Sequence, residues 1–229
     1  MRLIAKNCYQ LEHSKGSNGY LVNADGSTAL IDPGMPGGYT RLLEELRDAE
    51  PVIGPVTDIL LTHYDADHTR VVKQLQQTLG VPIWLGAADA AILRGDVPPP
   101  TRFRRFLARV FPTDYPAQVR ELAGEQTIVQ GLTTFPTPGH TPGHMAFQFG
   151  GVLFSGDAVT VSRTGELSQF YRLTISDPTQ AKQTEDLLRR RITGGMVQWI
   201  CAGHNAPAKT ANFLGVARWP PSSLRPRIE

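Results

Sequence analysis

Six consecutive positions, from His63 to His68, carry two imidazoles and two carboxylates, and only Thr62 separates them from the apolar run at 59–61. Imidazole nitrogens and carboxylate oxygens are the donors with which proteins bind zinc, iron or manganese. Ionisable groups packed so closely beside a buried strand repel one another and lose hydration unless a cation compensates them. The spacing therefore predicts a metal centre at the end of this strand.

The remaining donor residues share one setting, because each lies in a glycine-containing turn at or after the end of a predicted strand. Loops that follow several strands can meet at one edge of a sheet, which is where binding sites commonly form. The joint pattern predicts one centre rather than scattered surface residues. These residues are His140, His144, Asp157 and His204.

Hydrophobic periodicity predicts the framework that positions these residues. Alternating or continuous apolar runs bounded by turn residues indicate strands, whereas apolar residues at helical spacing indicate helices. The predicted strands are 2–11, 19–22, 28–31, 57–62, 81–85, 127–129, 132–136, 145–149, 152–155 and 197–201. The predicted helices are 39–49, 69–79 and one that begins at Pro178 with Asp177 as its N-cap.

The segment 96–116 begins with three prolines and continues as a short basic amphipathic stretch, which predicts an insertion or lid. A packing helix with solvated arginines is favoured over a role at a membrane surface or on a substrate anion. The expected apolar face is Phe103, Phe106, Leu107 and Val110, and the expected polar face is Arg102, Arg105 and Arg109.

Length and composition predict one domain over 1–229, with an irregular tail at 218–229. The chain has 229 residues, 41% of them hydrophobic, and its 23 basic and 21 acidic residues give a net charge of +2. This balance offers no bulk attraction to nucleic acid. Neither a secretory leader nor an apolar run of membrane-spanning length is found, so a cytoplasmic protein without a membrane span is expected. Cys8 and Cys201 are expected to be reduced, structural thiols.

The ordered motifs resemble the metallo-β-lactamase superfamily, from about residue 31 to residue 204. The resemblance implies an α/β fold, an αββα four-layer sandwich of two mixed β-sheets flanked by helices, with a dinuclear metal site at one edge. The motifs are Ile31-Asp32-Pro33-Gly34, His63-x-Asp65-x-Asp67-His68, Gly139-His140-Thr141-x-Gly143-His144, Ser155-Gly156-Asp157 and Gly203-His204.

Carried over residue by residue, the resemblance implies two metal sites. One would use His63, Asp65 and His140, the other Asp67, His68 and His204, and Asp157 would bridge them. Asp67 would also act in catalysis by accepting a hydrogen bond from the attacking water, while Asp32 and His144 would orient ligands.

Asp65 is a departure, because the family commonly has a second histidine there. If its carboxylate binds, the first site becomes harder and more negative. Two divalent ions are expected, with zinc favoured and iron or manganese as alternatives. If Asp65 does not bind, a single occupied site becomes the alternative.

Such a centre predicts a metallo-hydrolase that activates hydroxide and acts on a small ester, thioester or lactone. One alternative is an iron-dependent redox enzyme similar to persulfide dioxygenases or flavodiiron proteins. Phosphodiesterase or nuclease activity is a further alternative, which the near-neutral charge disfavours. A metal-stabilised scaffold without an open coordination position is the non-enzymatic alternative. The substrate's identity and the oligomeric state stay open.

Overall fold

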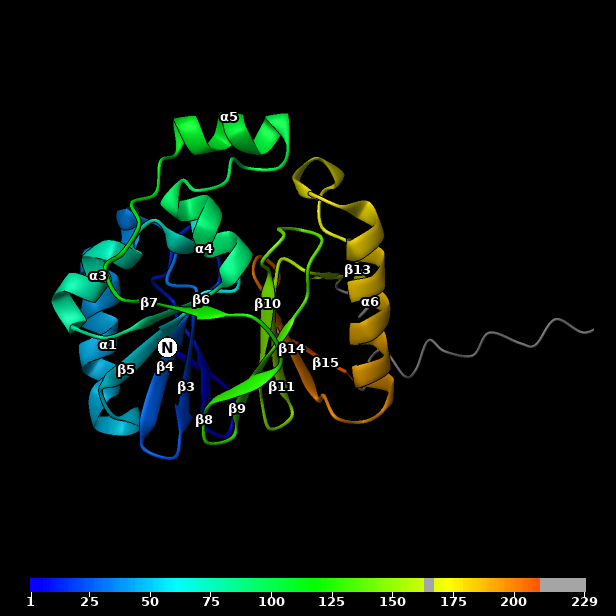
Figure 1. Ribbon diagram of the computed structural model, residues 1–229. Helices are drawn as coiled ribbons and strands as arrows, with labels where there is room; N and C mark the ends of the chain where they lie inside the picture. The colour runs from blue at the N-terminus through cyan, green and yellow to red at the C-terminus, as the bar shows by residue number, and fades with distance from the viewer. Residues whose placement is uncertain (163–166, 211–229) are drawn as a thin grey trace, which may run out of the picture.

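A computed structural model of the chain describes residues 1–162 and 167–210. Two mixed sheets lie face to face, and helices cover their outer faces (Figure 1). The fold predicted from the resemblance is therefore confirmed. The tail predicted at 218–229 lies outside the described residues.

The first sheet has seven strands in the order β1 to β7. The N-terminal strands pair antiparallel through short turns, whereas β4 to β7 pair parallel through helical crossovers. Its strands are β1 (Arg2–Ala5), β2 (Cys8–Gln10), β3 (Tyr20–Ala24), β4 (Ser27–Ile31), β5 (Val56–Leu60), β6 (Ile83–Gly86) and β7 (Val119–Leu122).

The second sheet has six strands in the order β15-β14-β11-β10-β9-β8. Gly150 has a φ of 52°, which suits the tight turn between β10 and β11. The strands are β8 (Gln126–Val129), β9 (Leu132–Pro136), β10 (Met145–Phe149), β11 (Val152–Gly156), β14 (Trp199–Ala202) and β15 (Ala208–Lys209), and a separate pair is β12 (Thr160–Val161) with β13 (Leu167–Ser168).

The helices bury the outer faces of both sheets and extend over one edge. In Figure 1, α1 and α3 lie against the first sheet, α6 lies against the second, and α4 and α5 lie above the upper edge. The α-helices are α1 (Tyr39–Ile53), α2 (Ala66–Thr69), α3 (Val72–Leu79), α4 (Ala87–Arg94), α5 (Arg102–Val110) and α6 (Pro178–Thr193), and short 3-10 turns are η1 (Pro36–Gly38) and η2 (Arg172–Thr174).

Three apolar layers hold this arrangement together. The central layer lies between the sheets and includes Tyr20, Leu60, Phe147 and Phe154. The outer layers join the first sheet to α1 and α3, and the second sheet to α6. Burial of this apolar surface is the main favourable contribution to folding, and it makes the sheets a rigid support for the loops at their edge.

The segment 86–126 departs most from the predicted pattern. It contains α4 and β7, which the hydrophobic periodicity did not indicate. The expected face of α5 is wrong: Phe103, Phe106 and Val110 are exposed, while Arg104 is only 2% exposed. The face of α5 that lines the cavity described below follows positions 104, 107, 108 and 111, which have helical spacing but begin with an arginine.

Within the described ranges, no helix combines the length and the apolar character that crossing a membrane requires. Cys8 and Cys201 are both buried and free.

Candidate metal centre

The predicted donor residues meet at the upper edge of the two sheets. His63 follows β5, and Asp67 and His68 lie in the short helix α2 that starts immediately afterwards. The loops that follow β9, β11 and β14 bring the remaining donors to the same edge. All the residues predicted to bind or orient metal gather here: Asp32, His63, Asp65, Asp67, His68, His140, His144, Asp157 and His204.

Asp32 fixes the orientation and the protonation of two imidazoles. Its Oδ2 accepts hydrogen bonds from the Thr62 hydroxyl at 2.7 Å and from His68 Nδ1 at 3.0 Å. Because the Thr62 hydroxyl donates its one proton to Asp32, it accepts from His63 Nδ1 at 2.9 Å. Both rings therefore carry hydrogen on Nδ1, and the Nε2 lone pairs face the centre.

His144 plays a similar part beneath Asp157. The backbone N–H of Asp157 donates to His144 Nε2 at 3.2 Å, and His144 Nδ1 then donates to the Thr137 hydroxyl at 2.8 Å. The ring also stacks on His63, with centroids 5.1 Å apart. His144 thus supports the loop that carries Asp157 rather than pointing into the centre.

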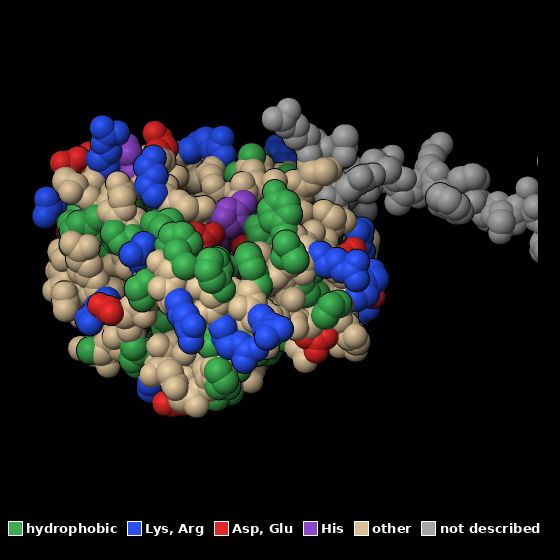
Figure 2. All heavy atoms as spheres, turned by 90° about the horizontal axis from the view of Figure 1, so that it is seen from above, with side chains coloured by type: hydrophobic (Ala, Val, Ile, Leu, Met, Phe, Trp, Pro, Cys, Tyr) green, Lys and Arg blue, Asp and Glu red, His purple; other side chains and the backbone are tan. Residues whose placement is uncertain are grey.

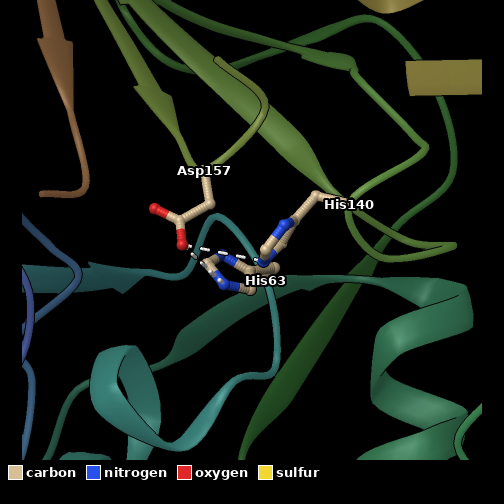
Figure 3. Close-up of side chains that lie close together, drawn as sticks. All are labelled: His63, His140 and Asp157. Atoms are coloured by element: carbon tan, nitrogen blue, oxygen red, sulfur yellow. Dashed lines mark ion pairs between the residues drawn. The ribbon is translucent and has the colours of Figure 1, made fainter. Parts of the chain in front are cut away.

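The first donor group comprises His63, His140 and Asp157 (Figure 3). Asp157 Oδ2 lies 3.6 Å from His140 Nε2 and 4.0 Å from His63 Nε2. All three side chains are buried, and they come from three different loops. The separations leave room for a cation between the donor atoms.

The second donor group comprises Asp67, His68 and His204. His204 Nε2 lies 3.1 Å from Asp67 Oδ2 and 3.3 Å from Asp157 Oδ2. His68 Nε2 lies 3.6 Å from Asp157 Oδ1. Asp157 Oδ2 therefore lies near histidines of both groups, and Oδ1 lies near His68 of the second group.

These residues fit divalent metal ions, because several of their buried donor atoms have no hydrogen-bond partner. His63 Nε2, His68 Nε2 and Asp157 Oδ1 are buried and make no hydrogen bond. Buried polar atoms without partners are costly. Three such atoms, two from the segment after β5 and one from the loop after β11, indicate that a cation completes their interactions.

The electrostatics lead to the same inference. Burial alone would raise the pKa of Asp157, but the surrounding imidazoles, His68 foremost, hold it well below its ordinary value. Burial lowers the pKa of His204, yet Asp157 and Asp67 together raise it to about 9. The carboxylates thus attract positive charge strongly, and a metal ion would compete with protons for the same positions.

Asp65 lies beside the first group but is bound to an arginine that the sequence did not indicate. Its Oδ1 accepts a charged hydrogen bond from Arg104 of α5. Its Oδ2 lies 3.0 Å from His140 Nε2 and 3.4 Å from His63 Nε2. One carboxylate oxygen is therefore engaged by Arg104, and the other faces the first group.

Asp89 is a second residue that the sequence did not reveal. This fully buried carboxylate in the first turn of α4 accepts from Tyr64 N at 3.1 Å, from the Thr141 hydroxyl at 2.6 Å and from Gly143 N at 2.6 Å. It joins the loop after β5 to the loop after β9. A lone aspartate in an apolar stretch gives no sequence signal for that role.

A cavity of about 430 Å³ opens onto the centre. Figure 2 shows it as a hollow with histidine and acidic side chains at its base and hydrophobic side chains around it. Its lining includes Asp67, Asp157 and His140, together with residues of α4, α5 and the segment before η2. A small molecule in this cavity would contact the donor groups directly.

Comparison with known proteins places these features in context. The family model described as the metallo-beta-lactamase superfamily matches residues 15–200. The uncharacterized protein YobT of Bacillus subtilis is 34% identical over 149 residues, which cover 62% of this chain and 61% of YobT. A hydroxyacylglutathione hydrolase of Anaeromyxobacter dehalogenans is 31% identical over 150 residues, covering 64% of this chain and 48% of the relative. The chain thus spans about half to three fifths of these curated relatives.

Solved structures give the same picture. TTHA1623 in a di-iron-bound form aligns with a TM-score of 0.63 at 27% identity, covering 86% of this chain and 92% of that protein. The metallo-beta-lactamase FIM-1 from Pseudomonas aeruginosa in its mono-zinc form aligns with a TM-score of 0.67 at 18% identity, covering 93% and 90%. The metals named for these two proteins differ, so fold alone does not select the metal.

Proposed function

The chain belongs to the metallo-beta-lactamase superfamily, and we propose that it is a metal-dependent hydrolase that cleaves a small ester or thioester at a centre of two metal ions. The observation that carries this proposal is the pair of donor groups on either side of Asp157. The cavity that opens onto them gives a small substrate access.

The proposed ligands are His63, His140 and Asp157 for one ion, and Asp67, His68, His204 and Asp157 for the other. Divalent cations held there would lower the pKa of a water molecule and polarise the substrate carbonyl. Asp65 would join the first group through Oδ2, which lies 3.0 Å from His140 Nε2 and 3.4 Å from His63 Nε2.

The protein's own residues would orient the reactants. Asp67 is partly exposed at the base of the cavity, and its carboxylate can accept a hydrogen bond from the attacking water. Phe170 packs against His140 and His204, with ring centroids 5.4 Å and 5.2 Å apart, and so limits access of bulk water on one side. Asp32 and His144 would hold the ligands in the required orientation.

A thioester is favoured as the scissile bond because several relatives are named hydroxyacylglutathione hydrolases. Those relatives match only in part of their length, and assays on a thioester, an oxygen ester and a lactone distinguish the three bonds. Iron-dependent oxygen consumption would instead support the redox alternative, which the di-iron form of TTHA1623 keeps relevant.

A hydrolysis panel tests the proposal directly. Metal-free protein would be reconstituted separately with zinc, iron and manganese and assayed on simple thioesters, esters and lactones. We expect hydrolysis that a chelator abolishes and the metal restores, and that is lost in Asp67→Ala. Chelator-insensitive hydrolysis, or no turnover with any of the metals, would contradict it.

A further inference from the structure

We propose that the cavity binds the acyl group of the substrate and that this group is uncharged and apolar. This inference rests on the proposed hydrolase function, and it names the substrate class for that site. The cavity walls are the first observation. Most of the residues that line the cavity are apolar, among them Ile92, Leu93, Leu107, Ala108, Phe111 and Phe170.

The position of these walls relative to the centre defines what they can contact. Phe170 packs on one histidine from each donor group, so the apolar wall begins at the donor residues themselves. Leu107, Ala108 and Phe111 continue that wall along α5 and its C-terminal end. A carbonyl held at the centre would therefore extend its hydrocarbon portion along these side chains.

The charges around the cavity argue against an anionic acyl group. Arg104 is the only Lys or Arg among the described residues that line it. Its positive charge is already paired with Asp65, and its Nη2 donates to the His140 carbonyl at 2.7 Å and to the Thr174 carbonyl, whereas its Nε makes no hydrogen bond. A carboxylate on the acyl chain would be buried without a cationic partner, which is costly.

Thioesters of one neutral thiol with different acyl groups test this inference. We expect kcat/KM to rise about fourfold for each methylene added from acetyl towards octanoyl, until the cavity is filled. Isohexanoyl and succinyl groups have equal numbers of heavy atoms, and we expect the succinyl thioester to be at least about tenfold poorer. Equal rates across the chain-length series, or equal rates for this matched pair, would overturn the proposal.

Two phenylalanines near the end of α5 provide matched variants. Phe111 lines the cavity with 41% of its surface exposed, whereas Phe106 is 60% exposed and does not line the cavity. Phe111→Ala should reduce kcat/KM for octanoyl about tenfold and leave acetyl nearly unchanged; Phe106→Ala should change neither. An equal effect of both variants would contradict the assignment.

Binding of non-hydrolysable ketone analogues, in which a methylene replaces the thioester sulfur, separates this inference from the proposed function. Calorimetry should show affinity that increases with chain length in wild type and weakens in Phe111→Ala. Selective binding without turnover would refute the hydrolase proposal alone. Turnover without chain-length dependence would refute the acyl pocket alone.

A separate observation concerns Arg104. We infer that Arg104 is a positioning residue that pairs with Asp65 so that the two together take the place of a neutral imidazole beside the first donor group. The arginine is 2% exposed, and its partners are the Asp65 carboxylate and two backbone carbonyls. Among the described residues, Arg104 is the only Lys or Arg that pairs with Asp65, and the other partners of this carboxylate are His63 and His140.

Charge balance explains the pairing. A carboxylate at position 65 adds a negative charge to a buried centre that already holds Asp67 and Asp157. Arg104 offsets that charge and binds Oδ1, which directs Oδ2 towards His140 and His63. Because Arg104 also binds the Thr174 carbonyl, the same contact fixes α5 and η2 over the centre.

A rescue experiment distinguishes this role from simple anchoring of α5. In Asp65→His the guanidinium would lose its carboxylate partner and keep its charge beside an imidazole and a cation, so we expect bound metal to fall from about two ions per chain to about one. The double variant Asp65→His with Arg104→Leu removes that repulsion and should restore about two ions.

If Arg104 only anchored the helix, the double variant would bind less metal than Asp65→His, and that outcome would overturn the inference. Metal content measured by mass spectrometry is the readout, independent of activity. Arg105→Leu is the matched control because Arg105 is exposed on the same helix. Combining Arg105→Leu with Asp65→His should give no rescue.

Discussion

Replacing Asp32 by asparagine should lower metal affinity far more than it lowers the stability of the metal-free protein. Asp32 lies in the left-handed region with a φ of 47°, which asparagine also tolerates. The side-chain oxygen of the asparagine can still accept a hydrogen bond from Thr62 N, which lies 2.9 Å from Asp32 Oδ1 in wild type. Loss of one charged acceptor with shape retained should cost about 1–2 kcal/mol of unfolding free energy.

The larger effect is on protonation of the imidazoles. In the variant an NH2 group would face the Thr62 hydroxyl and His68 Nδ1, where Oδ2 now accepts at 2.7 Å and 3.0 Å. The hydroxyl would accept from that amide and donate to His63 Nδ1, so hydrogen would move to Nε2, which faces the centre. Loss of such a supporting group typically costs about 10–100-fold in metal affinity.

Competition with a chromogenic chelator measures the affinity, and urea unfolding of metal-free protein measures the stability. Asp58→Asn is the control: Asp58 accepts from the Trp84 indole at 2.7 Å, and its side chain is not among the donor groups. It should lose stability without losing metal. Wild-type metal affinity in Asp32→Asn would refute the reasoning about protonation.

Three further predictions follow from the surrounding structure. Burial raises the pKa of Asp89 to about 6, above its unfolded value of about 3.9, so this residue should make wild type lose about 3 kcal/mol of stability as pH rises from about 4 to about 6. Urea titrations of the metal-free protein at several pH values measure this loss, and Asp89→Asn should not show it. A variant with the same pH dependence of stability as wild type would contradict the role of Asp89. A Cβ at Gly86 would lie 1.8 Å from the Gly143 carbonyl oxygen, so Gly86→Ala should lower the free energy of unfolding by about 1–3 kcal/mol. In Gly37→Ala the added carbon would have no atom within 4 Å, so the free energy of unfolding should stay within about 0.5 kcal/mol of wild type. Excess chelator should lower Tm and added metal restore it, because cation binding to the folded state stabilises it; a Tm indifferent to both would count against a metal centre.

The sequence predicted the parts of the fold in which local pattern and long-range packing agree. The hairpin turns at 23–26 and 150–151 and the Asp177 cap of α6 are confirmed, since Asp177 accepts from Thr179 N and Gln180 N. The superfamily resemblance is confirmed by the family match. The assignment of individual metal ligands stays a prediction, although the structure brings the candidate residues together.

The segment over the centre could not be predicted, for a physical reason. Amphipathic periodicity assumes that apolar residues face the protein, but α5 turns Arg104 inward because a partly buried carboxylate on another loop provides its partner. Phe103 and Phe106 are exposed as a result. Such pairing depends on contacts between residues 39 positions apart, which periodicity within one segment cannot report.

Asp89 illustrates the same limit. Its three hydrogen-bond donors come from two loops that are distant in sequence, 25 and more than 50 positions away. Only the closed fold brings them to one carboxylate. The histidines were predictable because their loops follow strands, and strand ends share an edge.

The central claim is that Asp157 joins two donor groups into a hydrolytic metal centre. The most direct test is metal content, measured by mass spectrometry, alongside thioester hydrolysis for wild type and Asp157→Ala. The account predicts about two ions per chain with chelator-sensitive hydrolysis in wild type, and fewer ions with no hydrolysis in the variant. Full metal content and full activity in Asp157→Ala would contradict it.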